Sequence, residues 1–439
     1  MKDVDARGCA LSGATPAAAE ALERALAALL AWRSGAEAHL ATALEASPRL
    51  VMAHVLQGWM LACGRDPKRV AAVGEVVVRA SVLPANERER AHLAALAAVG
   101  DDDYDFAKAR LGALLRAHPR DPLALHAAHS FDYITGDTAR LRDRVAALLP
   151  FWSSDLPGYH ALLAMHAFGL EECGAYRQAE AVGLEAVAGP AKVPWATHAV
   201  AHVMEMQGRC EQGLAWLRAR QSDWADGNGF AGHHWWHLAL FHLESLDVPG
   251  ALAIYDAHLG GNNAALTLHR LDGAALLWRI HLLGADVGAR WDDIASGWDW
   301  SPEAVGHSAF NDVHGLLIRL GQQRWAQADS LIEAAQKRSD SADDSNADMT
   351  RDIGLPLMHG LRAFSTDCFN DALALISPVR AIAHRFGGSH AQRDLITQTL
   401  LACAAGARDV STAAKLLSAR PQSAVHTPLT VHWMDRVNS

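Results

Sequence analysis

The sequence predicts an all-α protein built from helical hairpins. Apolar residues recur at helical spacing along most of the 439-residue chain, and the alternating pattern of a strand is nearly absent. Short breaks at Gly, Pro, Asp or Ser separate segments of roughly 10–18 residues, the usual length of helices in globular proteins. These observations together favour a stack of short helices.

The first expected helices are 21–35, 36–46 and 49–64, each with apolar residues at i, i+3, i+4 and i+7. The β-branched run 74–82 fits a buried helix as well as a strand. The acidic stretch 101–106 is expected to form a turn that caps the next helix, because carboxylates are favourable at a helix N-terminus.

A repeated unit follows. Five segments share a turn residue, a bulky or polar residue about two positions later, and small residues at helical spacing: 174–187, 208–220, 246–259, 321–334 and 367–379. The first two begin 34 residues apart, and a helix is expected before each. This period, with Gly174, Tyr176 and Ala179, is typical of tetratricopeptide hairpins. The sequence therefore predicts a tetratricopeptide-like α-solenoid of about ten hairpins, curled tightly around a central pocket.

We expect one domain over 1–439. Its parts are the more divergent hairpins of 1–120, the central hairpins of 121–336, a flexible acidic loop at 337–352, and the C-terminal hairpins of 353–439. The loop is expected because 337–352 is polar and rich in Ser and Asp. A lid over a neighbouring site is the alternative for this segment.

The composition of the chain argues against two classes of binding partner. The net charge of −10 argues against nucleic acid and against an anionic membrane surface, both of which select basic surfaces. The N-terminus lacks the apolar core of a secretory signal, and no apolar run is long enough to span a membrane. The six cysteines form no C-x-x-C pair, as in cytoplasmic proteins with reduced thiols. We therefore predict a cytoplasmic protein, and its Ala-rich surface would permit a homodimer.

Several motifs are missing. The sequence contains no G-x-S-x-G nucleophile elbow, no phosphate-binding G-x-x-x-x-G-K-[ST] and no convincing dinucleotide fingerprint. Serine nucleophiles, nucleotide hydrolysis and NAD use are therefore poorly supported.

Histidine, tryptophan and carboxylate side chains concentrate at 195–244. His198 and His202 are four residues apart and Glu205 follows, so the three share one helical face. Such a set could bind a divalent metal or act as an acid–base pair with an orienting carboxylate. The internal Glu of the H-E-x-x-H motif is missing. Hydrogen bonds that fix the packing of the repeats are the alternative.

A second group lies at 233–244. His233 and His237 are four residues apart, and His234 is three residues before His237. Trp235 is placed beside these imidazoles, where it would suit a planar, cationic or aromatic ligand. Trp236 is expected to pack in the core.

Histidines also recur on the expected first helices of successive hairpins: His160 (with Glu171), His202, His237, His314, His359 and His390. First helices line the concave face of a tetratricopeptide superhelix, so these side chains are expected to converge on one basin. Asp312, Arg393 and Asp394 would supply carboxylates and a cation near two of them.

Longer motifs suggest a family. They are HAVAHVMEMQGR (198–209), HHWWHLALFHLE (233–244), YHALLAMHAFGLEECG (159–174), LLGADVGARW (282–291), FNDVH (310–314) and GSHAQRD (388–394). They resemble the tetratricopeptide repeat protein 38 family and its bacterial members, over most of the chain and more clearly from about residue 120. The resemblance implies an α-solenoid of degenerate repeats. It does not point to a particular activity. The segment 227–233 departs from the aromatic pattern expected there.

Three classes of function fit these residues. The first is a small-molecule enzyme, a hydrolase or lyase, whose catalytic candidates are His202, Glu205, His237, His314, His390 and Asp394. Its ligand-binding candidates are His160, Glu171, Trp195, His198, His234, Trp235, Asp312, His359 and Arg393. The second class is a peptide- or protein-binding scaffold. The third is a metal- or haem-binding protein. No cofactor is required by the sequence; a divalent metal has the candidate ligands His198, His202 and His237.

Overall fold

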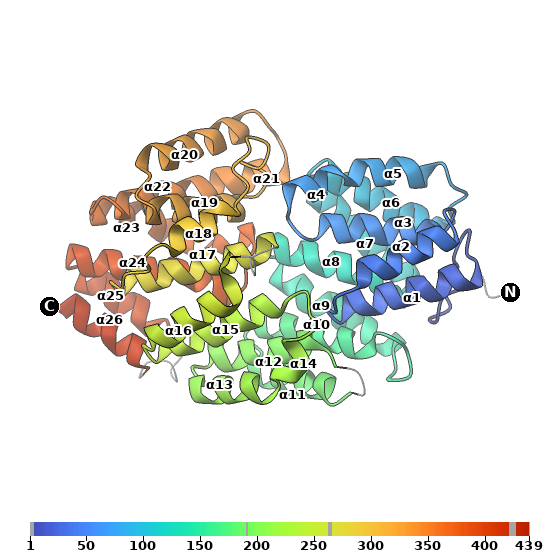
Figure 1. Ribbon diagram of the computed structural model, residues 1–439, viewed down its shortest axis with the longest axis horizontal. Coiled ribbons are helices and arrows are strands. Elements are labelled where there is room, and N and C mark those ends of the chain that lie inside the picture. Colours follow the sequence, from blue (N-terminus) through green and yellow to red (C-terminus); the bar gives the residue numbers. More distant parts are fainter. Residues whose placement is uncertain (1–3, 190–191, 262–265, 421–426, 439) are drawn as a thin grey trace. The chain divides into compact units, whose positions relative to one another are not determined.

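The computed structural model describes residues 4–189, 192–261, 266–420 and 427–438 (Figure 1). Over these ranges the protein is all-α, as predicted, with two isolated β-bridges, Val4–Ala10 and Arg33–Asn228, and no strand. No helix in the described ranges combines the length and apolar character needed to cross a membrane.

The chain divides into two compact units. The first comprises Met1–Val200 and Ser222–Phe230, and the second comprises Ala201–Gln221 and Ala231–Ser439. The division falls inside α12 (Pro194–Met206). Because α12 is one uninterrupted helix, its sequence carries no break that would mark the boundary.

The helices of the first unit pack mainly against their neighbours in sequence. They are α1 (Pro16–Leu30), α2 (Ala36–Ala46), α3 (Val51–Ala62), α4 (Pro67–Ala71), α5 (Val73–Ser81), α6 (Glu87–Gly100), α7 (Tyr104–Ala117), α8 (Pro122–Ile134), α9 (Thr138–Leu148), η1 (Leu149–Phe151), α10 (Tyr159–Glu172), α11 (Tyr176–Val187), the start of α12, and α14 (Gln221–Trp224) apart from its first residue. The β-branched run 74–82 is thus helical, and Asp103 caps α7 by accepting from the Phe106 amide at 3.0 Å, as expected.

Contacts between distant residues close the first unit. Trp32, which follows α1, stacks on Trp195 with ring centroids 4.7 Å apart and on Phe230 at 4.2 Å. Arg33 donates from Nη2 to the carbonyl of Asp223 at 2.8 Å. The N-terminal hairpin therefore meets the start of α12 and the segment after α14.

The second unit begins with the rest of α12. It continues with α13 (Cys210–Ala219), α15 (Ala231–Glu244), α16 (Val248–Ile254), the π-helix η2 (Tyr255–Leu259), α17 (Thr267–Leu282), α18 (Arg290–Ser296), α19 (Ala309–Gly321), α20 (Trp325–Asp340), α21 (Ser345–Met349), the π-helix η4 (Thr350–Gly354), α22 (Leu355–Phe364), α23 (Phe369–Arg380), η5 (Ala383–Phe386), α24 (His390–Ala407), α25 (Val410–Ser418) and α26 (Pro428–Asn438).

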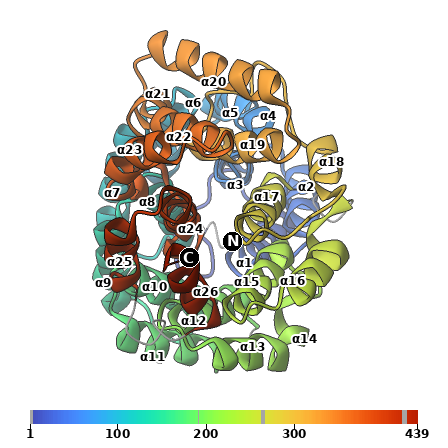
Figure 2. The same ribbon diagram turned by 90° about the vertical axis from the view of Figure 1, so that its left-hand side faces the viewer.

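The second unit also closes on itself. Besides their neighbours in sequence, α17 packs on α24 and α15 packs on α26, as Figure 2 shows. The buried Trp278 donates from Nε1 to Thr399 Oγ1 at 3.0 Å, and Arg279 donates from Nη2 to the Ala391 carbonyl at 2.7 Å. Helices that are far apart in the sequence are thereby brought around a common centre.

Several turns between consecutive helices share a left-handed conformation. Residues with positive φ stand in such turns at Arg65, Asp102, Gly136, Gly174, Gly208, Leu246, Gly284, Gln323, Asp367 and Arg408. A left-handed residue ends a helix by satisfying its last carbonyls and turns the chain back.

The predicted loop at 337–352 is wrong, because most of it is helical. Residues 337–340 end α20, and 345–352 lie in α21 and η4. Asp344 caps α21 by accepting from the Ala347 amide at 2.8 Å, and Asn346 and Thr350 are buried. The small polar residues that suggested a solvated loop thus serve as a helix cap and as packing contacts.

Candidate functional site

Three buried imidazoles cluster in the second unit. His202 lies on α12, and His233 and His237 lie one turn apart on α15. The ring centroids are 4.4 Å apart for His202 and His237 and 4.8 Å apart for His233 and His237. One ring nitrogen from each histidine lies within 4.8 Å of the others.

Two of these rings are each hydrogen-bonded to a carboxylate. His237 Nδ1 is 2.7 Å from Glu205 Oε2, and His233 Nδ1 is 2.7 Å from Asp272 Oδ2. An anionic oxygen only accepts, so each Nδ1 carries the proton and donates it, which fixes the tautomer of both rings. Gln392 supports Asp272 by donating to Oδ1 at 3.4 Å.

The surroundings of His237 disfavour a charged ring. Burial lowers the pKa of His237 well below its ordinary value of 6.5, and the nearby His202, His233 and His234 rings and Arg279 lower it further. The His237 imidazole is therefore neutral at pH 7.

Glu205 also lines a cavity of about 370 Å³. The charged and imidazole side chains on its wall are Arg380, Arg393, Arg420, Glu205, Glu244, Asp394 and His390. Arg420 pairs with Glu244 at 2.5 Å, and Asp394 accepts from Gln398 Nε2 at 2.9 Å. The cavity thus has three guanidinium groups and three carboxylates around a space of small-molecule size.

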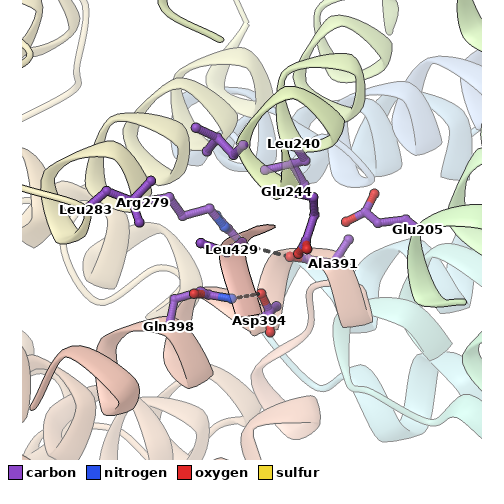
Figure 3. A pocket seen from close by; sticks show the side chains of 10 residues that line it. Glu205, Leu240, Glu244, Arg279, Leu283, Ala391, Asp394, Gln398 and Leu429 are labelled. Atoms are coloured by element: carbon purple, nitrogen blue, oxygen red, sulfur yellow. Dashed lines mark hydrogen bonds between the residues drawn. The ribbon is translucent and has the colours of Figure 1, made fainter. Parts of the chain in front are cut away.

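A smaller recess of about 30 Å³ shares part of this wall. Figure 3 shows that Glu205, Glu244 and Asp394 come from three different helices and reach toward the same space. The buried Arg279 also lines this recess and donates to the Ala391 carbonyl at the start of α24.

The structure brings together part of the predicted set. In the second unit, His202, Glu205 and His237 belong to the imidazole cluster, and His390, Arg393 and Asp394 line the cavity that Glu205 shares. His234 is fully buried next to this cluster on α15. Trp235 stacks on His258 with centroids 3.6 Å apart.

Three other candidates in the second unit are not among the residues that line this cavity. The ring of His314 is bonded through Nδ1 to the Phe310 carbonyl at 2.7 Å within α19. Asp312 is buried on the same helix and accepts from the Gly306 amide at 3.0 Å. His359 lines a separate hollow with Arg362 and Asp371.

The remaining candidates belong to the first unit. Trp195 lies between the Trp32 ring and the His129 ring, whose centroid is 5.4 Å away. His198 lies 5.4 Å from the Trp32 ring centroid. Glu171 is fully buried on α10, and His160 begins that helix beside Tyr159.

This aromatic region of the first unit holds two further imidazoles. Burial lowers the pKa of His126 to about 4 and that of His129 to about 3. Both rings are therefore neutral at physiological pH and pack as polar aromatic groups against Trp195.

Several site residues were absent from the predicted set. His233 had a signal, its four-residue spacing from His237, whereas Arg279 reaches the recess from α17 and had none. Arg380 ends α23 and Arg420 follows α25, and both line the cavity together with Glu244 of α15. No protein-family model matches the chain.

Proposed function

We propose that the second unit is an enzyme site for a small polar molecule that carries an anionic group. The observation that supports this is the cavity of about 370 Å³ with guanidinium, carboxylate and imidazole groups on one wall. Arginine is suited to carboxylate and phosphate groups because its planar fork can form two parallel hydrogen bonds. The volume lies within the range of small-molecule sites.

The ligand is held by Arg380 and Arg393, and the carboxylates of Glu244 and Asp394 accept from its donor groups. Both arginines line the cavity from neighbouring segments, the end of α23 and the first turn of α24. A molecule with an acid and a donor group, such as an amino acid or a hydroxy acid, matches this distribution of charge.

The reaction is proton transfer of the kind needed for hydrolysis or elimination. His390 and Asp394 are one turn apart on α24, and both line the cavity. An imidazole takes or gives a proton near neutral pH, and a carboxylate beside it stabilises the charged form. His390 is the acid–base group and Asp394 is its orienting carboxylate.

The fold that carries this site is a tetratricopeptide-like solenoid of about ten hairpins, related to the tetratricopeptide repeat protein 38 family. Its support is the left-handed turn residue that recurs from Arg65 to Arg408 in turns between consecutive helices, together with the motifs that resemble the family. Because distant helices of the second unit pack against each other, the solenoid has an enclosed pocket there and not an open groove.

The test is a thermal-shift screen of amino acids, hydroxy acids, dicarboxylates and phosphate esters, followed by calorimetry and turnover assays. Arg380→Gln should weaken binding of the selected ligand about ten- to hundred-fold, the effect of losing one charge-assisted hydrogen bond. Arg385→Gln is the matched control, because Arg385 belongs to the adjacent η5 and pairs with Asp352 at 2.9 Å.

His390→Gln and Asp394→Asn should reduce turnover at least about a hundred-fold while ligand binding persists. His384→Gln, in η5, is the control for a histidine off the cavity wall. Equal ligand affinity in Arg380→Gln and the wild type would contradict the binding site, and full turnover in His390→Gln would contradict the chemistry.

A further inference from the structure

We propose that His202, His233 and His237 form a binding site for one divalent transition metal ion, with zinc the best match. The three imidazoles come from α12 and α15, and each offers a nitrogen within 4.8 Å of the other two. Around a tetrahedral zinc ion, bonds of about 2.0–2.1 Å place the ligand nitrogens about 3.4 Å apart. A small inward movement of the rings is enough to reach that geometry.

Two of the three rings are hydrogen-bonded in the way that metal-binding histidines are. In such sites the nitrogen that does not bind the metal donates to a carboxylate, which orients the ring and raises its basicity. Glu205 does this for His237 and Asp272 does it for His233, both at 2.7 Å. In both rings Nε2 is then the atom that bears the lone pair for the metal.

Charge and ligand type favour zinc over the hard cations. Three imidazole ligands suit zinc and its neighbours among the transition metals, whereas calcium and magnesium require oxygen ligands. The carboxylates of Glu205 and Asp272 supply the negative charge that a buried divalent ion needs.

Packing alone is the simpler explanation for a histidine paired with a carboxylate, and the partly buried His242 illustrates it. His242 lies on the same helix, and its Nδ1 is 2.7 Å from Asp247 Oδ2, yet it joins no group of metal-ligating residues among the described residues. The cluster differs because three imidazoles from two helices converge on one point.

The experiment uses the full-length protein, stripped with a chelator and then titrated with zinc by calorimetry, and with cobalt by visible absorption. We expect one zinc ion per chain with a sub-micromolar Kd and the intense cobalt spectrum of a four-coordinate site. His233→Gln and His237→Gln should abolish this binding, and His242→Gln, the matched control, should retain it.

Asp272→Asn keeps all three ligands, and it tests the hydrogen bond that orients His233 if a histidine variant fails to fold. It should weaken zinc binding about ten- to hundred-fold. Circular dichroism would show which variants are folded. The proposal is overturned if the wild type takes up no stoichiometric zinc, or if folded His233→Gln or Asp272→Asn binds zinc as the wild type does. Zinc binding is measured without substrate, so its outcome is separate from that of the proposed enzyme reaction.

Discussion

Glu205 belongs both to the imidazole cluster and to the cavity wall of the second unit. Its Oε2 accepts from His237, and its side chain also lines the large cavity and the recess beside it. A single carboxylate thus connects a buried imidazole cluster to a space that a small molecule can occupy. Binding in the cavity would change the electrostatic surroundings of Glu205, and through the hydrogen bond those of His237.

Local spacing predicts part of this site, and long-range packing supplies the rest. The helical spacing of His202 and Glu205 was enough to put them on one face. Asp272 lies 39 residues from His233, and Gln392 lies 120 residues from Asp272. Sequence spacing carries no information about such partners, because the path of the intervening helices decides whether they meet.

Asp312 gives a prediction for the pH dependence of stability. Burial raises the pKa of its carboxyl to about 7, and the hydrogen bond from the Gly306 amide only partly opposes this. The pKa in the unfolded chain is about 3.9, so the folded state holds the proton more tightly. The contribution of Asp312 to the free energy of unfolding is therefore full below about pH 4 and is lost as the pH rises through 7.

Asp312→Asn should remove this loss, because an amide oxygen can still accept from Gly306 and cannot ionise. At pH 8 the variant should be more stable than the wild type by up to about 4 kcal/mol, and the difference should shrink at pH 5. Urea unfolding at both pH values measures it, with the exposed Asp435→Asn as the control. A difference between variant and wild type that does not change with pH would contradict the assignment.

At the scale of elements, helix periodicity is the strongest signal in this chain. It predicted two of the first three helices closely: the expected 36–46 is α2, and the expected 49–64 contains α3. The expected 21–35 overlaps α1, which begins and ends five residues earlier. The failure at 337–352 has a physical cause, since Asp344 and Asn346 are as suited to a helix cap and a buried contact as to a solvated loop. Composition alone does not separate these roles.

Close approach of helices depends on small residues at defined positions. A Cβ at Gly169 on α10 would lie 2.6 Å from the carbonyl carbon and oxygen of Leu141 on α9. Backbone atoms cannot move aside without separating the two helices. Gly169→Ala should therefore lower the free energy of unfolding by about 1–3 kcal/mol, the usual cost of overpacking.

Gly74→Ala on α5 is the matched control for this prediction. A Cβ there meets no atom within 4 Å, so the substitution should stabilise the protein by about 0.5–1 kcal/mol through helix propensity. Both variants can be compared by urea unfolding. If Gly169→Ala were as stable as Gly74→Ala, the contact between α9 and α10 would be looser than described.

At the scale of the whole molecule, each unit is closed by contacts between its distant parts. In the second unit, one such contact is the buried hydrogen bond from Trp278 to Thr399, two residues that are 121 positions apart in the sequence. Thr399→Val should cost about 1–3 kcal/mol, because it leaves the indole N–H buried without this acceptor.

A double-mutant cycle tests this bond. Once Trp278→Phe has removed the donor, adding Thr399→Val should cost less than Thr399→Val alone, by about 1 kcal/mol. Chemical unfolding of the four proteins gives the coupling energy. Strict additivity would show that α17 and α24 are held together by their apolar contacts and not by this bond.

The pairing of α17 with α24 also sets the order in which the protein can mature on the ribosome. The face of α17 that carries Trp278 and Arg279 is synthesised long before its partner helix emerges. At about 5–20 residues per second, the 121 residues between Trp278 and Thr399 take roughly 6–24 s to translate. For that interval the nascent chain holds an apolar surface open to solvent, a natural target for chaperones. Neither α24 nor the cavity wall that it provides exists until that interval has passed.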